Sequence, residues 1–282
     1  MSDARYAMGL RRLRLSIAAS TAACLAALAS ERTALAYRPF DGTDADVAAL
    51  GDFELELGPV HWYSQQGEHY LLAPATVLNL GYAPGWELVV DFQNSVGIDV
   101  PPGQPRDQLL DTDILTKGVL IPGVLQDKGP GPSVAAELGP LLPEANGQES
   151  FGASLNVIVS ERWPGLTVHL DNWLQLTRGD LHADWFEGVI LEGSFRAPAR
   201  PVAELFVEHE FIANVTTWSA LVGGIWRAGE DLDLDVGLRQ ASVDGERATE
   251  VRLGFTWTLG LWGGSKDEPR GQLGGPGVAM RR

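Results

Sequence analysis

The stretch Val251-Arg252-Leu253-Gly254-Phe255-Thr256-Trp257-Thr258-Leu259 places an apolar side chain at every second position. Successive side chains of a β-strand point to opposite faces, so this stretch has one apolar face and one polar or small face. The same period of two recurs in Phe53-Glu54-Leu55-Glu56-Leu57 and in Leu232-Asp233-Leu234-Asp235-Val236. No helical periodicity of comparable length is present, and the sequence therefore predicts an all-β protein.

Twelve segments of this kind follow one another along the chain. Tight turns with Pro or Gly join some of them, as at 83–85 and 163–165, and longer connections such as 96–110 join others. An even number of strands with short turns at one end and longer loops at the other is typical of bacterial barrels. We predict an antiparallel up-and-down transmembrane β-barrel of about 12 strands over residues 51–260. The predicted strands lie near 52–63, 69–82, 86–95, 111–121, 133–142, 151–160, 166–177, 184–194, 201–211, 216–227, 231–240 and 248–259.

The first 36 residues have the pattern of a secretory signal peptide. Three arginines over 11–14 precede an apolar stretch over 15–30, which is too short to span a bilayer comfortably. The triplet Ala34-Leu35-Ala36 matches a small-x-small cleavage site, so we expect cleavage near Ala36 and export. A permanent N-terminal anchor is the alternative. We expect 37–50 to be a periplasmic segment and the Gly-rich residues 261–282 to be a disordered tail.

Charge and cysteine content exclude several functional classes. The whole chain has a formal net charge of −16, and removing the +3 of residues 1–36 leaves −19 on the rest. Such an acidic chain lacks the basic footprint of a nucleic-acid-binding protein. The single cysteine, Cys24, lies in the predicted signal peptide, so the exported chain has neither a disulfide framework nor a cysteine nucleophile.

Most tryptophans lie close to the ends of predicted strands, and only Trp173 falls well inside one. Amphipathic indole rings suit the level of the lipid headgroups, where membrane barrels carry aromatic girdles. A soluble periplasmic β-sandwich, in which tryptophans fill a core, is the alternative. The predicted girdle consists of Trp62, Trp86, Trp163, Trp185, Trp218, Trp226 and Trp257.

The polar faces of the late strands carry charged side chains that we expect to line the lumen. Rings of acidic side chains in a pore favour cations, although a polar face held together by ion pairs explains the pattern equally well. The residues concerned are Glu204, Glu208, Asp233, Asp235 and Arg252.

Catalysis is not expected. His169 lies on a predicted polar face, with Ser154 and Asn156 as neighbours on the preceding strand. A barrel enzyme that modifies lipids needs its serine and histidine on the lipid-facing surface instead. The sequence contains no zinc-protease, phosphate-loop or nucleophile-elbow motif, so we predict no catalytic residue, no metal and no cofactor.

The stretch from Tyr37-Arg38-Pro39-Phe40-Asp41-Gly42-Thr43-Asp44 to Gly51-Asp52-Phe53-Glu54-Leu55-Glu56 resembles the opening of a known family. This is the outer-membrane family named for the MetA pathway of phenol degradation. Looser similarities are Leu72-Ala73-Pro74-Ala75, Val202-Ala203-Glu204-Leu205 and the closing stretch around Phe255. The resemblance implies a transporter-type outer-membrane barrel and supplies no catalytic residues. The chain departs from the family by lacking the second acid after Thr43-Asp44 and by continuing past the last strand.

Together these patterns predict an outer-membrane channel or transporter for a small, hydrophobic or aromatic molecule. The expected partners are outer-membrane lipid and lipopolysaccharide, the barrel-assembly machinery and an unknown small substrate, without nucleic acid. Three alternatives stay open: a structural outer-membrane protein, a barrel enzyme that modifies lipids, and a soluble periplasmic β-sandwich binding protein.

Overall fold

The computed structural model describes residues 38–99, 105–179 and 181–262, all of which belong to one compact unit. The predicted signal peptide with its cleavage site at Ala36 lies outside the described residues, as does most of the predicted tail. Within the described ranges, no helix has the length and hydropathy needed to cross a bilayer.

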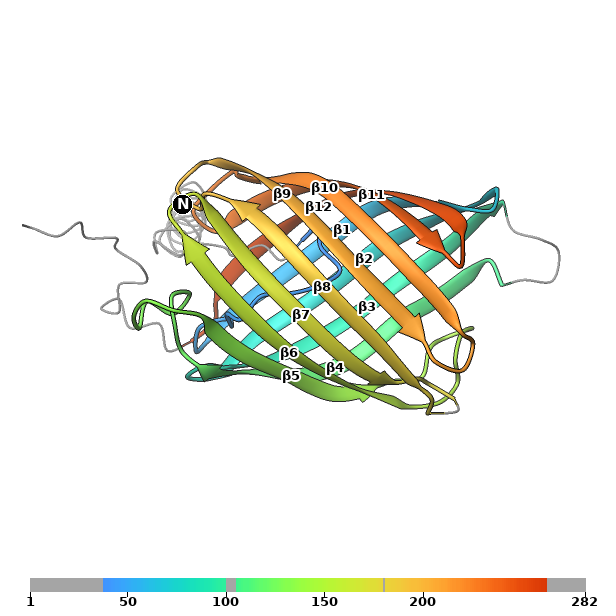
Figure 1. The fold of residues 1–282 in the computed structure, drawn as a ribbon, viewed down its shortest axis with the longest axis horizontal. Coiled ribbons are helices and arrows are strands. Elements are labelled where there is room, and N and C mark those ends of the chain that lie inside the picture. Colours follow the sequence, from blue (N-terminus) through green and yellow to red (C-terminus); the bar gives the residue numbers. More distant parts are fainter. Residues whose placement is uncertain (1–37, 100–104, 180, 263–282) are drawn as a thin grey trace, which may run out of the picture. The chain divides into compact units, whose positions relative to one another are not determined.

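Twelve antiparallel strands form a closed barrel, in which each strand pairs with its neighbours in sequence and β1 pairs with β12 (Figure 1). The prediction of an all-β, twelve-stranded, up-and-down barrel is therefore confirmed. A β-sandwich is excluded, because a sandwich has two separate sheets whereas here one sheet closes on itself. The strands are β1 (Asp52–Gln65), β2 (Glu68–Ala83), β3 (Trp86–Asp99), β4 (Asp107–Ile121), β5 (Ser133–Leu141), β6 (Gly152–Trp163), β7 (Leu166–Leu176), β8 (Ala183–Gly193), β9 (Ala199–Glu210), β10 (Val215–Arg227), β11 (Leu232–Val243) and β12 (Glu246–Gly260).

The two ends of the barrel are distinguished by what lies there. Asp52 at the start of β1 pairs with Gly260 at the end of β12, so both ends of the barrel sheet meet at what we call the terminus end. The tight turns at 84–85 and 164–165 also lie there, together with the longer 122–132 connection. The opposite, or loop, end carries the connections from β1 to β2, β3 to β4 and so on around the barrel.

Alternation of side chains sorts the residues between the two faces of the wall. In β6 the burial pattern alternates between buried and exposed positions over most of the strand, and Leu155 and Val157 are among the exposed side chains. Large apolar side chains cover the outside of the other strands in the same way. An apolar exterior around a closed sheet is what a barrel needs to face lipid, because every backbone group is already paired within the sheet.

The tryptophans predicted as a girdle lie near both ends of the wall. Trp62 and Trp218 are exposed near the loop end, and Trp86, Trp163, Trp226 and Trp257 are exposed near the terminus end. Trp185 differs, because it is partly buried and borders an interior cavity.

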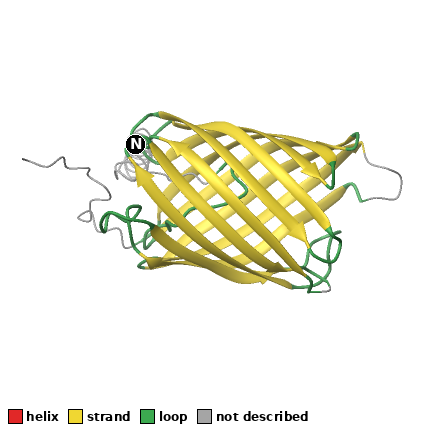
Figure 2. Ribbon diagram, in the orientation of Figure 1, coloured by secondary structure: helices red, strands yellow, loops and turns green. Residues whose placement is uncertain are grey.

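Residues 38–49, which we call the plug segment, run through the interior of the barrel without regular secondary structure (Figure 2). Ala45 and Ala48 are buried, as are Arg38 and Asp44. The sequence predicted a periplasmic segment that merely precedes the first strand, and the structure places it against the inward side chains of the wall instead. The reason is hydrogen bonding: the mid-strand charges of a narrow barrel have little water around them, and the backbone of the plug segment supplies their partners.

Candidate functional site

Backbone N–H groups of the plug segment attach it to the barrel wall. The N–H groups of Asp41 and Gly42 donate to the Glu204 carboxylate, at 3.0 and 2.7 Å. Further along, the N–H of Thr43 donates to Asp171 Oδ1 at 3.0 Å and that of Ala48 donates to Glu87 Oε2 at 2.6 Å. Hydrogen bonds from N–H groups to a carboxylate are stronger than those between neutral groups. Acidic side chains on several different strands therefore fix one course for this segment.

Arginines from the plug segment and the wall complete the attachment. Arg252 of β12 donates to the Pro39 carbonyl at 2.7 Å and to Asp41 Oδ1 at 2.8 Å, and also pairs with Glu250. Arg38 lies against His61 and Asp235, with Nε 3.5 Å from Asp235 Oδ2. Burial would raise the pKa of Asp41, but the guanidinium groups of Arg252 and Arg239 hold it below the ordinary aspartate value.

Two wall glycines leave room for the plug segment. A Cβ atom at Gly254 would lie 2.3 Å from Arg38 Nε, and one at Gly81 would lie 2.0 Å from the Ala49 carbonyl oxygen. Both distances are shorter than any van der Waals contact, so a side chain at either position would displace the segment. The wall and the plug segment are therefore shaped to each other.

Below the plug segment, the terminus half of the lumen is filled by charged side chains. Arg200 pairs with Glu192 at 2.9 Å and with Asp233 at 3.3 Å, and Arg227 Nε lies 3.6 Å from Asp233. Arg200, Glu192 and Asp233 are each at most 2 % exposed. These ion pairs therefore fill the lumen beside strands β8 to β11 in that half of the described structure.

His169 belongs to this filled layer. Its Nδ1 lies 2.8 Å from Ser160 Oγ and its Nε2 lies 3.5 Å from Glu192 Oε1. A serine, a histidine and a carboxylate therefore contact one another in sequence. Ser160 also accepts the N–H of Ala45, and neither Ser160 nor His169 has any exposed surface. A substrate has no room beside this serine, and the group acts as an anchor for the plug segment. The residues suggested from sequence as partners of His169 were Ser154 and Asn156, whereas the contact is made by Ser160.

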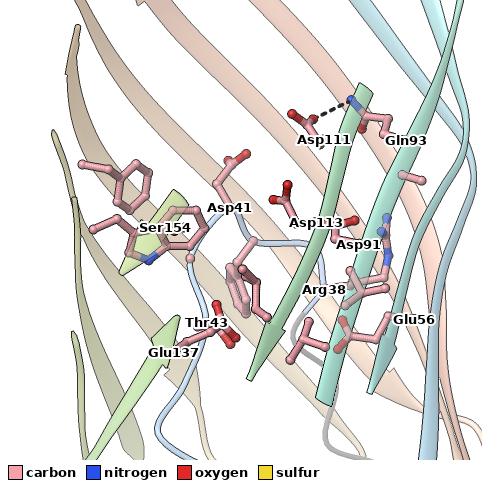
Figure 3. A pocket seen from close by; sticks show the side chains of 18 of the residues that line it. Arg38, Asp41, Thr43, Glu56, Asp91, Gln93, Asp111, Asp113, Glu137 and Ser154 are labelled. Atoms are coloured by element: carbon pink, nitrogen blue, oxygen red, sulfur yellow. Dashed lines mark hydrogen bonds between the residues drawn. The ribbon is translucent and has the colours of Figure 1, made fainter. Parts of the chain in front are cut away.

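The lumen contains a cavity of about 390 Å³, with the plug segment along one side (Figure 3). Its lining reaches from Gln93 and Asp111 in the loop half to Glu54 and Glu87 near the terminus end. Figure 3 shows Asp91, Asp111 and Asp113 on neighbouring strands, Asp41 and Thr43 on the plug segment, and Ser154 on a strand across from the aspartates. The volume lies within the range of pockets that hold small organic ligands.

One side of this cavity is aromatic. We call Trp173, Phe186 and Phe206 the aromatic wall; they come from the consecutive strands β7, β8 and β9. The ring centroids of Trp173 and Phe186 are 5.1 Å apart, and those of Phe186 and Phe206 are 4.8 Å apart. Phe186 and Phe206 are buried, although most side chains that line the lumen are polar. A continuous ring surface of this kind supplies apolar contact to a ligand.

Another side of the cavity is acidic. We call Asp91, Asp111 and Asp113 of β3 and β4 the acidic wall. Arg178 Nη2 pairs with Asp113 at 2.5 Å, and Asp111 accepts a hydrogen bond from Gln93 at 3.5 Å. Among the described residues, no cationic side chain lies within ion-pair distance of Asp91, or of Glu208 beside the aromatic wall. The cavity therefore holds two carboxyl groups without a direct ion pair to a described cationic side chain, and Arg239 is the nearest cation to act on Glu208.

The five charged residues predicted to line the lumen all lie on the inner side of the wall, but in different places. Glu204 and Arg252 hold the plug segment, and Asp235 is 3.5 Å from Arg38. Asp233 is completely buried in the filled terminus layer. Of the five residues, Glu208 and Arg252 border the cavity.

Sequence reasoning missed the aromatic wall and the plug segment. Trp173 had been noted as the one tryptophan in a strand interior, and this position was the available signal for a lumenal ring. No comparable signal marked the plug segment, because its contacts join residues far apart in sequence, from 39 positions for Ala48 and Glu87 to 163 for Asp41 and Glu204. Among the described residues, no group of three or more His, Cys, Asp or Glu side chains is placed to hold a metal ion.

Comparison with known proteins gives similarity of fold. No family model matches the sequence, and no curated protein is similar enough to count as a relative. An outer membrane channel from Pseudomonas putida F1 superposes with a TM-score of 0.59 at 9 % identity, over 78 % of this chain and 100 % of that one. This similarity shows that the chain has the barrel fold of that channel.

Two further structures superpose less closely. The KdgM porin has a TM-score of 0.47 at 11 % identity, over 73 % of this chain and 98 % of that one. The CymD monoaromatic hydrocarbon channel has a TM-score of 0.43 at 7 % identity, over 75 % of this chain and 89 % of that one.

Proposed function

We propose that this protein is an outer-membrane channel that passes small molecules through a lumen narrowed by the plug segment. The observation that carries the proposal is a cavity inside a closed barrel whose exterior is apolar. A barrel with an apolar outer surface is stable in lipid, and a solute can occupy a cavity within the barrel during passage.

We also propose a location and a route of assembly, on the pattern of the sequence. We propose cleavage of residues 1–36 near Ala36, insertion by the barrel-assembly machinery, and contact of the exposed tryptophans with lipid and lipopolysaccharide. The terminus end then faces the periplasm. Membership of the family named for the MetA pathway of phenol degradation, and hence a hydrophobic or aromatic solute, is also proposed on the resemblance of the Arg38-Pro39-Phe40 stretch and of the strands.

The plug segment makes passage selective rather than porin-like. It occupies the middle of the lumen, and the filled layer of Arg200, Glu192 and Asp233 lies beyond it towards the terminus end. A solute that enters from the loop end passes beside these contacts on its way to the other end. We expect small single-channel currents and slow flux.

The test has two stages. Fractionated cells should hold the protein in the outer membrane, and the purified barrel should change gel mobility on boiling, because a closed barrel stays compact in detergent until heated. The protein is then reconstituted in planar bilayers. Discrete current steps support a channel, whereas a heat-modifiable barrel without any conductance or solute flux contradicts it and leaves a structural outer-membrane protein.

A further inference from the structure

We propose that the cavity is a binding site for a small organic cation that carries an aromatic or other flat apolar group. This rests on the proposed channel function, since a solute must reach the lumen to bind. It goes further by naming the chemistry of the solute. The class contains protonated aromatic amines and related ammonium compounds, in which one end is a ring and the other a positive charge.

The aromatic wall sets the apolar half of the ligand. Three rings on adjacent strands present faces and edges at centroid spacings of 4.8 and 5.1 Å, which are ordinary stacking distances. Gly188 on β8 keeps this surface open, because a Cβ atom there would lie 2.8 Å from Phe186 Cε1. A ligand ring that stacks on Trp173 or Phe186 loses contact with water and gains dispersion contact.

The charge balance of the cavity sets the sign of the ligand's polar half. Each cationic side chain of the cavity lining already contacts a carboxylate; these are Arg38, Lys117, Arg178, Arg239 and Arg252. Arg178 pairs with Asp113 and with Glu144, and Arg239 pairs with Asp41 and with Glu250. Among the described residues, no cationic side chain forms a direct ion pair with Asp91 or Glu208, although Arg239 lies near enough to attract the Glu208 carboxylate. An incoming ammonium group would supply that ion pair, whereas a carboxylate would meet negative charge.

The two halves of the site reinforce each other. Aromatic faces attract cations as well as rings, and the barrel already uses this contact, because the Arg239 guanidinium carbon lies 5.1 Å from the centroid of Phe206. Glu208 stands directly opposite Phe186 in the pairing of β8 with β9, so a carboxylate and a ring are cross-strand neighbours. A cation held between them contacts both at once.

The experiment measures binding to the purified, folded barrel in detergent by titration calorimetry, so that it does not depend on conduction. Four probes of similar size separate the contributions: phenethylammonium, phenylacetate, 2-phenylethanol and propylammonium. We expect phenethylammonium to bind about tenfold more tightly than any of the others, which corresponds to one cation–π contact plus a partner carboxylate. Equal or tighter binding of phenylacetate or propylammonium, or no binding of any probe, would overturn the proposal.

Matched variants locate the site. Phe186→Leu and Asp91→Asn should each weaken phenethylammonium binding by roughly tenfold. Phe151→Leu and Asp107→Asn are the controls, since both residues are exposed and lie outside the cavity lining. Every variant is first checked for heat-dependent gel mobility, so that loss of folding is not mistaken for loss of binding. If the controls weaken binding as much as the cavity variants, the assigned site is wrong.

Failure of this inference can be told apart from failure of the channel. A barrel that conducts potassium chloride but does not prefer phenethylammonium contradicts only the ligand assignment. A barrel that binds phenethylammonium but passes no current keeps the site and contradicts the channel.

Discussion

The two halves of the lumen are built from the same alternating strands, yet they differ in what fills them. The terminus half is packed with ion pairs around Arg200 and Asp233, and the plug segment lies across its inner side. The loop half contains a cavity between an aromatic and an acidic wall. The alternation of side chains along each strand accounts for the polar inner surface of both halves. The two halves differ in whether each buried charged side chain has a partner of opposite charge. Paired charges stabilise the barrel, whereas unpaired charges are available to bind a ligand.

The largest expected effect is on the supporting half. Arg252→Gln removes the guanidinium group that pairs with Asp41 and Glu250, so each of these two carboxylates loses one ion pair. Breaking a buried ion pair from one side costs about 3–5 kcal/mol. Because Arg239 still pairs with Asp41 and Glu250, we expect the free energy of unfolding of the barrel to fall by less than that amount. Urea unfolding of the purified barrel, followed by tryptophan fluorescence, measures the change.

Arg247→Gln is the matched control, because Arg247 is an exposed residue of the same strand. An Arg252→Gln barrel as stable as the control would show that the ion pairs of the plug segment add little to stability.

The second effect is on passage. Glu204→Ala removes the acceptor of the Asp41 and Gly42 N–H groups, so the plug segment is held less firmly. We expect single-channel conductance to rise by roughly twofold or more, because the current depends on the open width of the lumen. Planar-bilayer recordings provide the measurement.

Glu187→Ala, on the exposed face of β8, should leave the conductance as it is. Unchanged conductance in the Glu204→Ala barrel as well would mean that the plug segment does not limit the current.

The third effect is on ion selectivity in the cavity half. Asp91 and Glu208 form no direct ion pair with a cationic side chain of the described structure, so the lumen should prefer cations over anions. Replacing both by lysine reverses two charges and should shift the reversal potential in a salt gradient towards anion preference. The same replacement at Asp107 on the exposed end of β4 tests for a general surface effect. A reversal potential that does not move would show that these carboxylates lie off the ion path.

The prediction of the barrel itself rested on local information. The period-two pattern in stretches such as 251–259 is a property of neighbouring residues, and all twelve strands were placed within a few residues of their observed bounds. The plug segment could not be placed in this way. Its contacts with Glu204, Asp171 and Glu87 join it to three separate strands, and nothing in residues 38–49 taken alone indicates which charges they meet.

The smallest expected effect is a pH dependence of the plug segment. Burial raises the pKa of Asp44 to about 7, against the pull of Lys117, whose Nζ is 3.8 Å away. The docked segment therefore binds a proton between the ordinary aspartate pKa and about 7, and docking weakens as pH rises through that interval.

Hydrogen exchange of residues 38–49 should be slower at pH 5 than at pH 8, after correction for the intrinsic rate. Asp44→Asn should abolish this dependence, because the amide does not titrate. If the pH dependence persists unchanged in Asp44→Asn, it arises from other titratable groups in or beside the segment, such as Asp46 or His169.

The sequence by itself determined the closed, twelve-stranded barrel, its apolar exterior and the inward position of its charged side chains. These follow from alternation along each strand, which is local and strong. Only the tertiary structure decided that the plug segment enters the lumen, that Ser160 rather than Ser154 meets His169, and that Asp91 shares a cavity with Trp173. Those results depend on how twelve strands close into one ring, because closure alone brings distant strands face to face.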